Sequence, residues 1–431
     1  MFFTLPSFAS PSLKSCLHRI PSRSFSFTSN FRYPRTPLRY GLKPELQPSF
    51  RQQLAQENVV PSFHNTVKFP SVRNQIIFFL LGSFTVYAFA ANQTNVDTIY
   101  WNQILKSTGS PLYRVIDPSS EDLARVRHRT MVEKLRAGLT NLRDGIKGWP
   151  PVLGDYAAYL YVQIAQPIVD ATEGRRVCWA IGVANTLVWL AWRFPRLKPV
   201  MDRSFTHSPL SGRSYTMLTS VFSHHSFMHL LFNSMALASF GSAASVYLTT
   251  QQRQDPKGLP ESTVIYHFLA FFVTAGLFAS LTSHVASARL KFPRMVTQMV
   301  AELSQKNLPT TAGSLKASSD TVRKAATSIL PSLGASGAIY AAVTLTALAY
   351  PDSEVSIMFF PMFHLPAQVA IFGLVGLDVL GIIRGWRLFD HWAHLGGAVF
   401  GIWYHTYGMK VWNWFRKPYI VLPEWLVKTS K

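Results

Sequence analysis

The sequence predicts an all-α protein that crosses a membrane several times, and three observations carry this expectation. Hydrophobic residues make up 48% of the 431 residues, whereas charged residues make up only 15%. Soluble domains average about 25% charged residues, so this balance is typical of a membrane protein. The third observation is a series of apolar stretches, several of which approach the roughly 20 residues that cross a bilayer as a helix.

The charge and cysteine content argue against several other classes of protein. The formal net charge is +21, but the basic residues lie mainly outside the apolar stretches, where they set topology and meet anionic lipid. We therefore expect no nucleic acid partner. The two cysteines, Cys16 and Cys178, form neither a disulfide framework nor a zinc pattern. No acidic residue accompanies the cluster of His224, His225 and His229, so we expect no metal and no cofactor.

The first part of the chain has the composition of an organelle transit peptide. Residues 1–44 contain seven Lys or Arg, many Ser and no Asp or Glu. A secretory signal would need an uninterrupted apolar core, which this region lacks. The run that begins at Arg23 resembles a mitochondrial processing pattern. We expect a mitochondrial transit peptide over 1–32, followed by a matrix-side segment over 33–74.

The apolar stretches predict one membrane helix followed by a core of six. The seven stretches are 75–91, 176–194, 225–248, 264–287, 333–350, 356–383 and 393–412. A connecting region, 92–173, separates the first stretch from the other six. The expected plan is therefore an extra N-terminal transmembrane helix at 75–91, a six-helix core within 174–412 and a C-terminal tail over 413–431.

Loop charge predicts the orientation of these helices. An excess of three, five and one positive charges falls on the loops 196–214, 288–330 and 384–392, whereas the loop 249–263 is neutral and 351–355 is acidic. Positively charged loops remain on the side from which a membrane protein inserts. We therefore expect a multi-pass protein of the mitochondrial inner membrane, with the basic loops in the matrix.

Four polar residues are expected at one depth in the membrane. Ser336 and His394 each lie in the first turn of a helix that enters from the basic side, and His229 and Asn233 lie four residues apart on one face of a third helix. Polar side chains at membrane depth are costly and are therefore candidates for function. These residues form a candidate catalytic site near the basic side.

The residue types point to nucleophilic catalysis. A serine hydroxyl becomes a good nucleophile when a base takes its proton, and histidine is the usual base, so we expect Ser336 and His394 to form a dyad. Tyr340 lies one turn after Ser336 and can stack on the imidazole. His229 and Asn233, together with the backbone N–H of Ser336, can donate hydrogen bonds to a developing oxyanion.

The dyad requires two helices to approach closely. No carboxylate is expected to join Ser336 and His394 as a third catalytic residue. Gly397-x-x-x-Gly401 and Gly337-x-x-x-Ala341 are small-residue faces of the kind that let membrane helices come close together. Asp390 is expected in the loop beyond the helix of His394. Asp378 is interpreted as a structural polar contact.

The three motifs resemble those of the rhomboid family of intramembrane serine proteases, in particular its mitochondrial branch. The motifs are Gly334-Ala-Ser336-Gly337, Ala393-His394-Leu-Gly-Gly397 with Gly401, and His225-Ser-Phe-Met-His229-Leu-Leu-Phe-Asn233, and the resemblance covers about 174–412. It implies Ser336 as nucleophile, His394 as general base, His229 and Asn233 as oxyanion donors, Tyr340 beneath the imidazole, and Gly334 as part of the serine motif. One departure is the stretch Gly-Arg213-Ser-Tyr215-Thr, where many members carry Trp-Arg.

The resemblance implies a protease that cleaves the membrane segments of single-span proteins. By resemblance, the substrates would be a dynamin-like GTPase and cytochrome c peroxidase precursor, with inner-membrane lipid as a further partner and the oligomeric state left open. The alternative is a non-catalytic rhomboid-like adaptor that binds membrane helices, which would be expected to have lost Ser336 or His394. An intramembrane metalloprotease would need His-Glu-x-x-His, which the sequence lacks.

Overall fold

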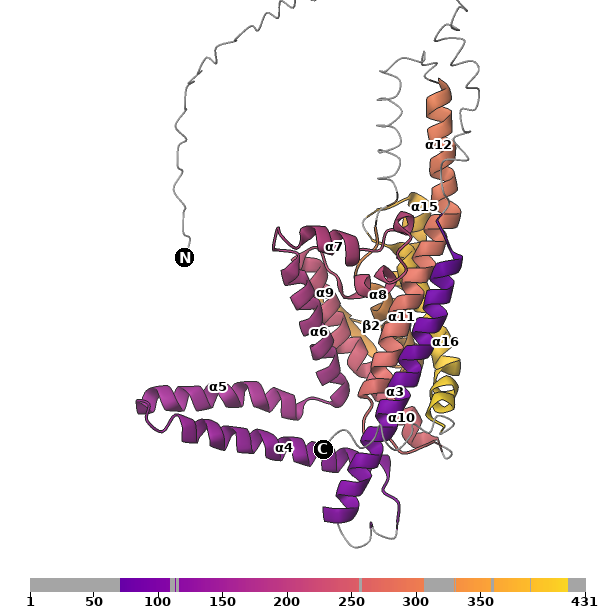
Figure 1. Ribbon diagram of the computed structural model, residues 1–431. Helices are drawn as coiled ribbons and strands as arrows, with labels where there is room; N and C mark the ends of the chain where they lie inside the picture. The colour runs from indigo at the N-terminus through magenta and orange to yellow at the C-terminus, as the bar shows by residue number, and fades with distance from the viewer. Residues whose placement is uncertain are drawn as a thin grey trace, which may run out of the picture. The chain divides into compact units, whose positions relative to one another are not determined.

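The computed structural model describes residues 70–108, 113, 116–255, 258–305, 329, 331–357, 360–387 and 389–417. These residues are mostly helical and belong to one compact unit (Figure 1). The expected transit peptide, most of the segment 33–74, the middle of the loop 288–330 and the end of the tail 413–431 lie outside the described residues.

Each of the seven expected apolar stretches contains a helix. In chain order the helices are α3 (Arg73–Thr108), α6 (Glu173–Ala191), α9 (Phe227–Ala236) continued by α10 (Ser242–Gln254), α11 (Ile265–Ala286) continued by α12 (Phe292–Gln305), α14 (Ser336–Ala349), α15 (Ala367–Arg384) and α16 (His391–Arg416). Single π-helical turns, η4 (Leu237–Gly241) and η5 (Ser287–Lys291), join the continued pairs. The short elements α7 (Lys198–Ser204), η2 (Pro209–Ser211), α8 (Thr216–Thr219) and η3 (Ser220–Phe222) fill the loop after α6.

Length and composition identify four helical spans among the described residues that could cross a membrane. These are Arg73–Thr108, Phe227–Gln254, Ile265–Gln298 and Ala367–Arg384, and Ser336–Ala349 is a shorter apolar helix. The structure therefore agrees with an all-α polytopic membrane protein. The arrangement of one plus six crossings remains a prediction.

The expected helical stretch 356–383 was wrong at its beginning. Residues Glu354–Ile357 (β1) and Phe360–Pro366 (β2) form an antiparallel hairpin, with Glu354 opposite Pro366, and α15 begins only at Ala367. A proline disfavours helical backbone in the residue before it, and Pro361 and Pro366 both interrupt this run. A short apolar run does not by itself distinguish a strand from a buried helix.

The connecting region 92–173 is mostly helical. Helix α3 continues through its polar end to Thr108, and α4 (Ser120–Gly145) and α5 (Pro151–Asp170) form a helical hairpin. The start of α4 is defined by Ser119 and Asp122, each of which caps the backbone N–H of the other. Hydrogen bonds from Ser119 lower the pKa of the Asp122 carboxyl.

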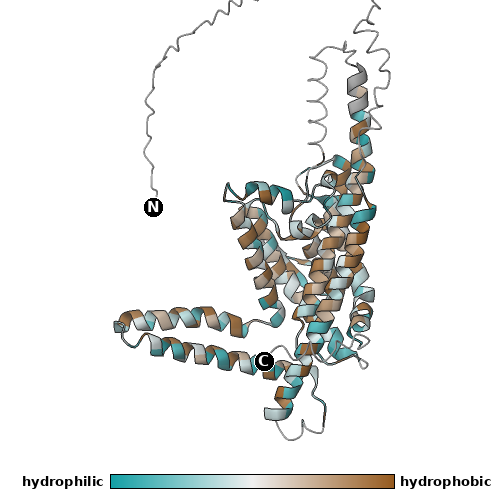
Figure 2. Ribbon diagram, viewed as in Figure 1, coloured by the Kyte–Doolittle hydropathy of each residue, from teal (hydrophilic) through white to brown (hydrophobic). Residues whose placement is uncertain are grey.

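Helices α11 and α14 form the centre of the bundle. Most of their residues are buried, whereas α3 and α15 bury only a few. The exposed side chains of α15 include Phe372 and Ile383, which are 73% and 74% exposed. Figure 2 shows hydrophobic residues along the outer helices as well as within the bundle, as expected for a protein whose outer surface contacts lipid.

Helices α14 and α16 approach each other at their backbones. A Cβ atom added at Gly397 would lie 2.0 Å from the carbonyl oxygen of Gly337, and one added at Gly401 would lie 2.6 Å from that of Ala341. Only glycine fits at these two positions without movement of the opposite backbone. The small-residue packing expected from the sequence is therefore confirmed.

Polar contacts define the two ends of the bundle. At one end Ser283 donates to Asp390 (2.6 Å), which joins the end of α11 to the start of α16. At the other end the Arg416 guanidinium donates to Glu261 (2.9 Å) and to Asn95 (2.9 Å), which joins the end of α16 to the loop before α11 and to α3. The first end holds the starts of α14 and α16 and hence Ser336 and His394.

We predict that Gly397→Ala lowers the free energy of unfolding by about 1–3 kcal/mol, because the methyl group forces two backbones apart. Denaturation in detergent micelles measures this change. The matched control is Gly376→Ala on α15, where nothing lies within 4 Å of an added Cβ atom. Equal stability of the two variants would show that the α14–α16 approach tolerates a wider spacing.

Candidate active site

The structure brings Ser336 and His394 into hydrogen-bond contact. Ser336 is the first residue of α14, and His394 lies in the first turn of α16. The Oγ atom of Ser336 is 2.9 Å from Nε2 of His394. His394 is only 7% exposed, so its imidazole is largely shielded from water. The two residues are 58 positions apart in the sequence and meet because α14 and α16 touch.

Tyr340 stacks against the imidazole of His394. The ring centroids are 4.3 Å apart, and the ring planes differ by 10°. Tyr340 lies one helical turn after Ser336, so the same helix supplies the hydroxyl and the ring that supports its partner. A parallel aromatic ring restricts rotation of the imidazole and holds its edge toward Ser336.

A buried carboxylate contacts the other nitrogen of this imidazole, so the expectation of a dyad without a carboxylate was wrong. Nδ1 of His394 is 3.0 Å from Oδ1 and 3.3 Å from Oδ2 of Asp378. Asp378 lies on α15 and is 3% exposed. The short turn between α15 and α16 places the inner faces of these helices side by side, and sequence alone does not show which face carries Asp378. Asp390 instead caps α16 through the N–H of Ala393 (3.3 Å).

A second histidine shares the same carboxylate oxygen. Nδ1 of His391 is 2.6 Å from Oδ1 of Asp378. Because an ionised carboxylate only accepts hydrogen bonds, both imidazoles carry a proton on Nδ1. His394 therefore presents a bare Nε2 to Ser336, which is the tautomer that a general base needs. His391 was not among the residues expected at the site, and its one signal in the sequence is its position three residues before His394 on the same helix.

Within the described part of the chain, Asp378, His391 and His394 form a group that could also hold a metal ion. Their three ligand atoms lie within 4.8 Å of one another. The spacings of 2.6 and 3.0 Å from the two Nδ1 atoms to Oδ1 are those of hydrogen bonds, which satisfy both donors. A metal on Nδ1 of His394 would move its proton to Nε2 and prevent it from accepting the proton of Ser336. The hydrogen-bonded arrangement therefore fits a base better than a metal ligand.

His229 and Asn233 converge on the backbone just before Ser336. Gly334 has a φ angle of +124°, and a Cβ atom there would lie 2.7 Å from Cε1 of His229 and 3.8 Å from Nδ2 of Asn233. The Nδ2 atom of Asn233 also lies 2.9 Å from Nε2 of His224. His224 is fully buried and was not among the expected site residues. An amide nitrogen has two hydrogens, so Asn233 retains one for another acceptor.

A loop after α6 holds the segment that leads into Ser336. His207 and Ser332 exchange two backbone hydrogen bonds of 2.9 Å. The ring of His207 is buried between Thr216 (2.8 Å) and His284 (3.0 Å). Burial lowers the pKa of His207 to about 3, so this contact stays uncharged at neutral pH.

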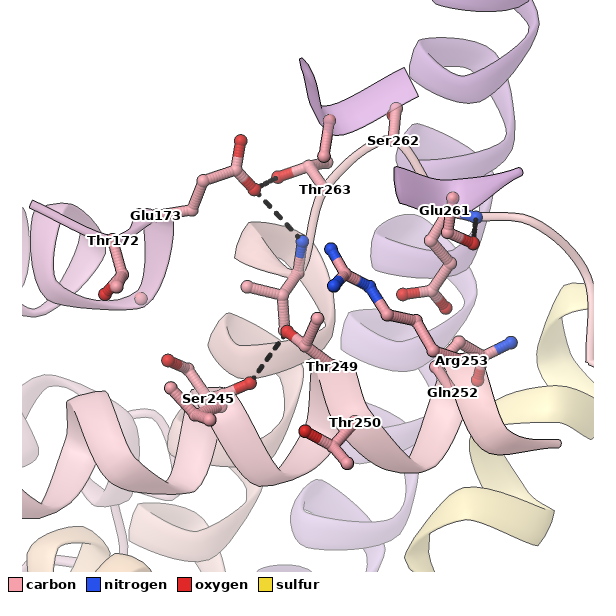
Figure 3. A pocket seen from close by; sticks show the side chains of 15 residues that line it. Thr172, Glu173, Ser245, Thr249, Thr250, Gln252, Arg253, Glu261, Ser262 and Thr263 are labelled. Atoms are coloured by element: carbon pink, nitrogen blue, oxygen red, sulfur yellow. Dashed lines mark hydrogen bonds between the residues drawn. The ribbon is translucent and has the colours of Figure 1, made fainter. Parts of the chain in front are cut away.

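Two cavities lie at opposite ends of the bundle. The one beside Ser336 has a volume of about 10 Å³ and is lined in part by Gly334 and Ala393. It has room for about one water molecule. A cavity of about 300 Å³ lies at the other end, beside the starts of α4 and α6 and the end of α10 (Figure 3). It is lined by Glu173, Thr263 and other residues, none of which belongs to the candidate site.

Substitution of Gly334 tests the contact with His229. We predict that Gly334→Ala destabilises the protein more than Gly212→Ala, because both positions have positive φ angles but nothing lies within 4 Å of a Cβ atom at Gly212. Denaturation midpoints in detergent compare the two variants. If their midpoints shift equally, backbone strain alone explains the loss and His229 does not crowd Gly334.

Comparison with known proteins identifies relatives of the chain. The family described as "Rhomboid domain" matches residues 211–411. The human "Presenilin-associated rhomboid-like protein, mitochondrial" is 31% identical over 286 residues, which are 65% of this chain and 61% of the relative. "Rhomboid protein 1, mitochondrial" of Saccharomyces cerevisiae is 24% identical over 336 residues, which are 74% of this chain and 80% of the relative. "RHOMBOID-like protein 12, mitochondrial" of Arabidopsis thaliana is 26% identical over 232 residues, which are 53% of this chain and 57% of the relative. The matched region thus spans about three fifths of the length of the mammalian relatives.

Proposed function

The chain belongs to the rhomboid family, as its motifs indicated, and we propose that it is an intramembrane serine protease of the mitochondrial inner membrane. Its relatives and its apolar helices support a mitochondrial membrane protein. The observation that carries the proposal is the hydrogen bond of 2.9 Å between Ser336 and His394, whose other nitrogen contacts Asp378 at 3.0 Å.

Acylation begins with transfer of a proton from Ser336 to His394. The Ser336 oxygen attacks the carbonyl carbon of a substrate peptide bond while Nε2 of His394 takes the hydroxyl proton. The imidazolium that forms is stabilised by the Asp378 carboxylate on Nδ1. Collapse of the tetrahedral intermediate breaks the C–N bond, and the leaving amine receives the proton from His394. A water molecule then attacks the acyl-enzyme with His394 again as base.

His229, Asn233 and the backbone N–H of Ser336 are the proposed donors to the oxyanion. Gly334 lets the two side chains approach the backbone before Ser336, because a Cβ atom would meet His229 at 2.7 Å. Loss of one such donor in a hydrolase costs about 3–4 kcal/mol of transition-state stabilisation. His224 acts through Asn233 as a positioning residue, since its Nε2 accepts from the Asn233 amide.

The proposed substrates are single-span membrane proteins whose cleaved segment is locally unwound. The cavity of about 10 Å³ beside Ser336 does not admit a peptide, so the neighbouring elements must move apart before a carbonyl reaches the serine. By family resemblance, a dynamin-like GTPase and cytochrome c peroxidase precursor are candidates. We also propose that the six-helix core is preceded by one spanning helix, α3, with the basic loops in the matrix and inner-membrane lipid around the bundle.

The alternative function is a non-catalytic adaptor that binds membrane helices. An adaptor does not need a serine aligned with a histidine, nor a carboxylate and an aromatic ring that hold this histidine in place. The geometry of Ser336, His394, Asp378 and Tyr340 therefore favours catalysis over the adaptor.

We predict that Ser336→Ala and His394→Ala each lower cleavage of a single-span reporter in liposomes by about 10³-fold or more. The matched control is His405→Ala on the same helix, whose ring stacks on Tyr247 and lies outside the site; it should retain near-normal cleavage. Cleavage that persists in Ser336→Ala would contradict the protease assignment. A wild-type protein that binds the reporter without cleaving it would support the adaptor.

We predict that Asp378→Asn lowers kcat by about 10²–10⁴-fold with little change in KM, because the amide no longer holds His394 in the required tautomer. His391→Leu should lower kcat by a smaller factor, and His391→Asn should restore much of it, since its Nδ2 can replace the Nδ1 donor. Steady-state cleavage rates across pH measure both effects. Equal activity of Asp378→Asn and wild type would remove the carboxylate from the mechanism.

A further inference from the structure

The structure contains an apolar surface that proteolysis does not explain, and we propose that it binds a membrane surface. The surface is the outer face of α5 in the α4–α5 hairpin. Its proposed partner is an anionic phospholipid leaflet, the one that surrounds the bundle end opposite Ser336. In this arrangement α5 lies in the boundary between headgroups and acyl chains, and α4 covers it from the aqueous side.

The outer face of α5 carries a regular stripe of large apolar side chains. Val152, Tyr156, Leu160 and Ile164 follow each other at intervals of four residues and are 79%, 59%, 43% and 68% exposed. No residue of this 20-residue helix is buried. Residues four apart lie on one side of a helix, so the four side chains form one continuous apolar surface. Such a surface in water is unfavourable and indicates a partner.

The inner face of α5 is already occupied by α4. The hydroxyl of Tyr161 donates to the carbonyl of Leu135 at 2.9 Å. A Cβ atom at Gly138 would lie 2.5 Å from the same hydroxyl, so the two helices are closely packed there. The stripe therefore points away from the hairpin, and among the described residues nothing buries it.

The hairpin is joined to the membrane bundle at both of its ends. The guanidinium of Arg176, in the first turn of α6, donates to the carbonyls of Ile168 (3.0 Å) and Ala171 (2.9 Å) at the end of α5. Arg127 of α4 pairs with Asp97 of α3 (3.5 Å) and with Glu173 of α6 (3.3 Å). These contacts hold the hairpin beside the polar part of α3 and the start of α6.

The hairpin therefore lies at the level where the apolar part of α3 gives way to its polar part and where α6 begins. In Figure 1 the α4–α5 hairpin lies across the direction of α6. Helix α6 runs upward from the end of α5, and α4 lies below α5. Figure 2 shows mostly hydrophobic residues on α5 and mostly hydrophilic residues on α4. A helix with this division of residues, parallel to the surface and rich in tyrosine, is typical of the membrane interface.

The charge of α4 favours anionic lipid over a second protein. Its exposed side chains include Lys134, Arg136 and Arg143, and none of the three forms an ion pair within the described part of the chain. Each basic residue at an anionic membrane surface contributes about 1 kcal/mol of attraction, which falls off within a Debye length of about 8 Å. Because α5 lies between α4 and the bilayer, these three cations each add a weaker attraction than that. The same unpaired cations would repel a second copy of this hairpin, so a bilayer is the better partner.

The test uses the full-length protein in liposomes with one fluorescent label at a time. Cys16 and Cys178 are replaced by serine and alanine, and an environment-sensitive fluorophore is attached at Leu160→Cys or Ile164→Cys. The matched control is Asn141→Cys on α4. We expect the two α5 labels to be quenched by nitroxide-bearing phospholipid and protected from iodide in the water. The Asn141 label should show the reverse.

A second experiment tests the charge. We expect lipid quenching at Ile164 to be stronger in vesicles with phosphatidylglycerol than in pure phosphatidylcholine, and Lys134→Gln/Arg136→Gln/Arg143→Gln to remove this difference. Arg125→Gln/Arg129→Gln, which changes residues already paired with Asp122 and Glu133, should keep it.

Three outcomes would overturn the proposal. Iodide quenching at Leu160 and Ile164 would place the stripe in water. Protection of both labels from both quenchers would mean that protein covers the stripe. If this protection is lost when each vesicle holds a single chain, the covering protein is a second copy of this chain. An anionic-lipid effect that the triple variant does not reduce would remove α4 from the interaction. None of these outcomes bears on the protease assignment, because the labels lie at the bundle end opposite Ser336.

Discussion

The backbone contact between α14 and α16 is the constraint on which the site depends. Gly397 and Gly401 have no space for a side chain, because a Cβ atom would lie 2.0 and 2.6 Å from carbonyl oxygens of α14. This approach brings the first turns of the two helices together, so that Oγ of Ser336 lies 2.9 Å from Nε2 of His394. A wider spacing would separate the proposed nucleophile from its proposed base. The two glycines therefore contribute to the candidate site by setting the distance between Ser336 and His394.

The polar groups at the site satisfy one another in a mostly apolar surrounding. A buried carboxylate is costly without hydrogen-bond donors, and Asp378 has two, Nδ1 of His391 and Nδ1 of His394. The bond from His394 also sets the tautomer of its own imidazole, and Tyr340 limits the rotation of this ring. Structural satisfaction of the buried acid and orientation of the base are thus achieved by the same contacts.

The two ends of the bundle are built for different tasks. One end holds Ser336 beside a cavity of about 10 Å³. The other end is held by Arg416 and Glu261, both buried and 2.9 Å apart, and it carries the α4–α5 hairpin and the cavity of about 300 Å³. Removing one member of a buried ion pair typically costs about 3–5 kcal/mol, so this end resists change.

The sequence was sufficient to predict the apolar helices, the small-residue faces at Gly397 and Gly401, and the places of Ser336 and His394 in the first turns of their helices. These features follow from local composition and from spacing along one helix. Tertiary packing set three further features: the contacts of Asp378 and His391 at the candidate site, the support of Asn233 by His224, and the pairing of β1 with β2 where a helix was expected. The contacts of a carboxylate such as Asp378 depend on which neighbouring helix its own helix face packs against. That face is set by the packing of α15 on α16, which no local pattern records.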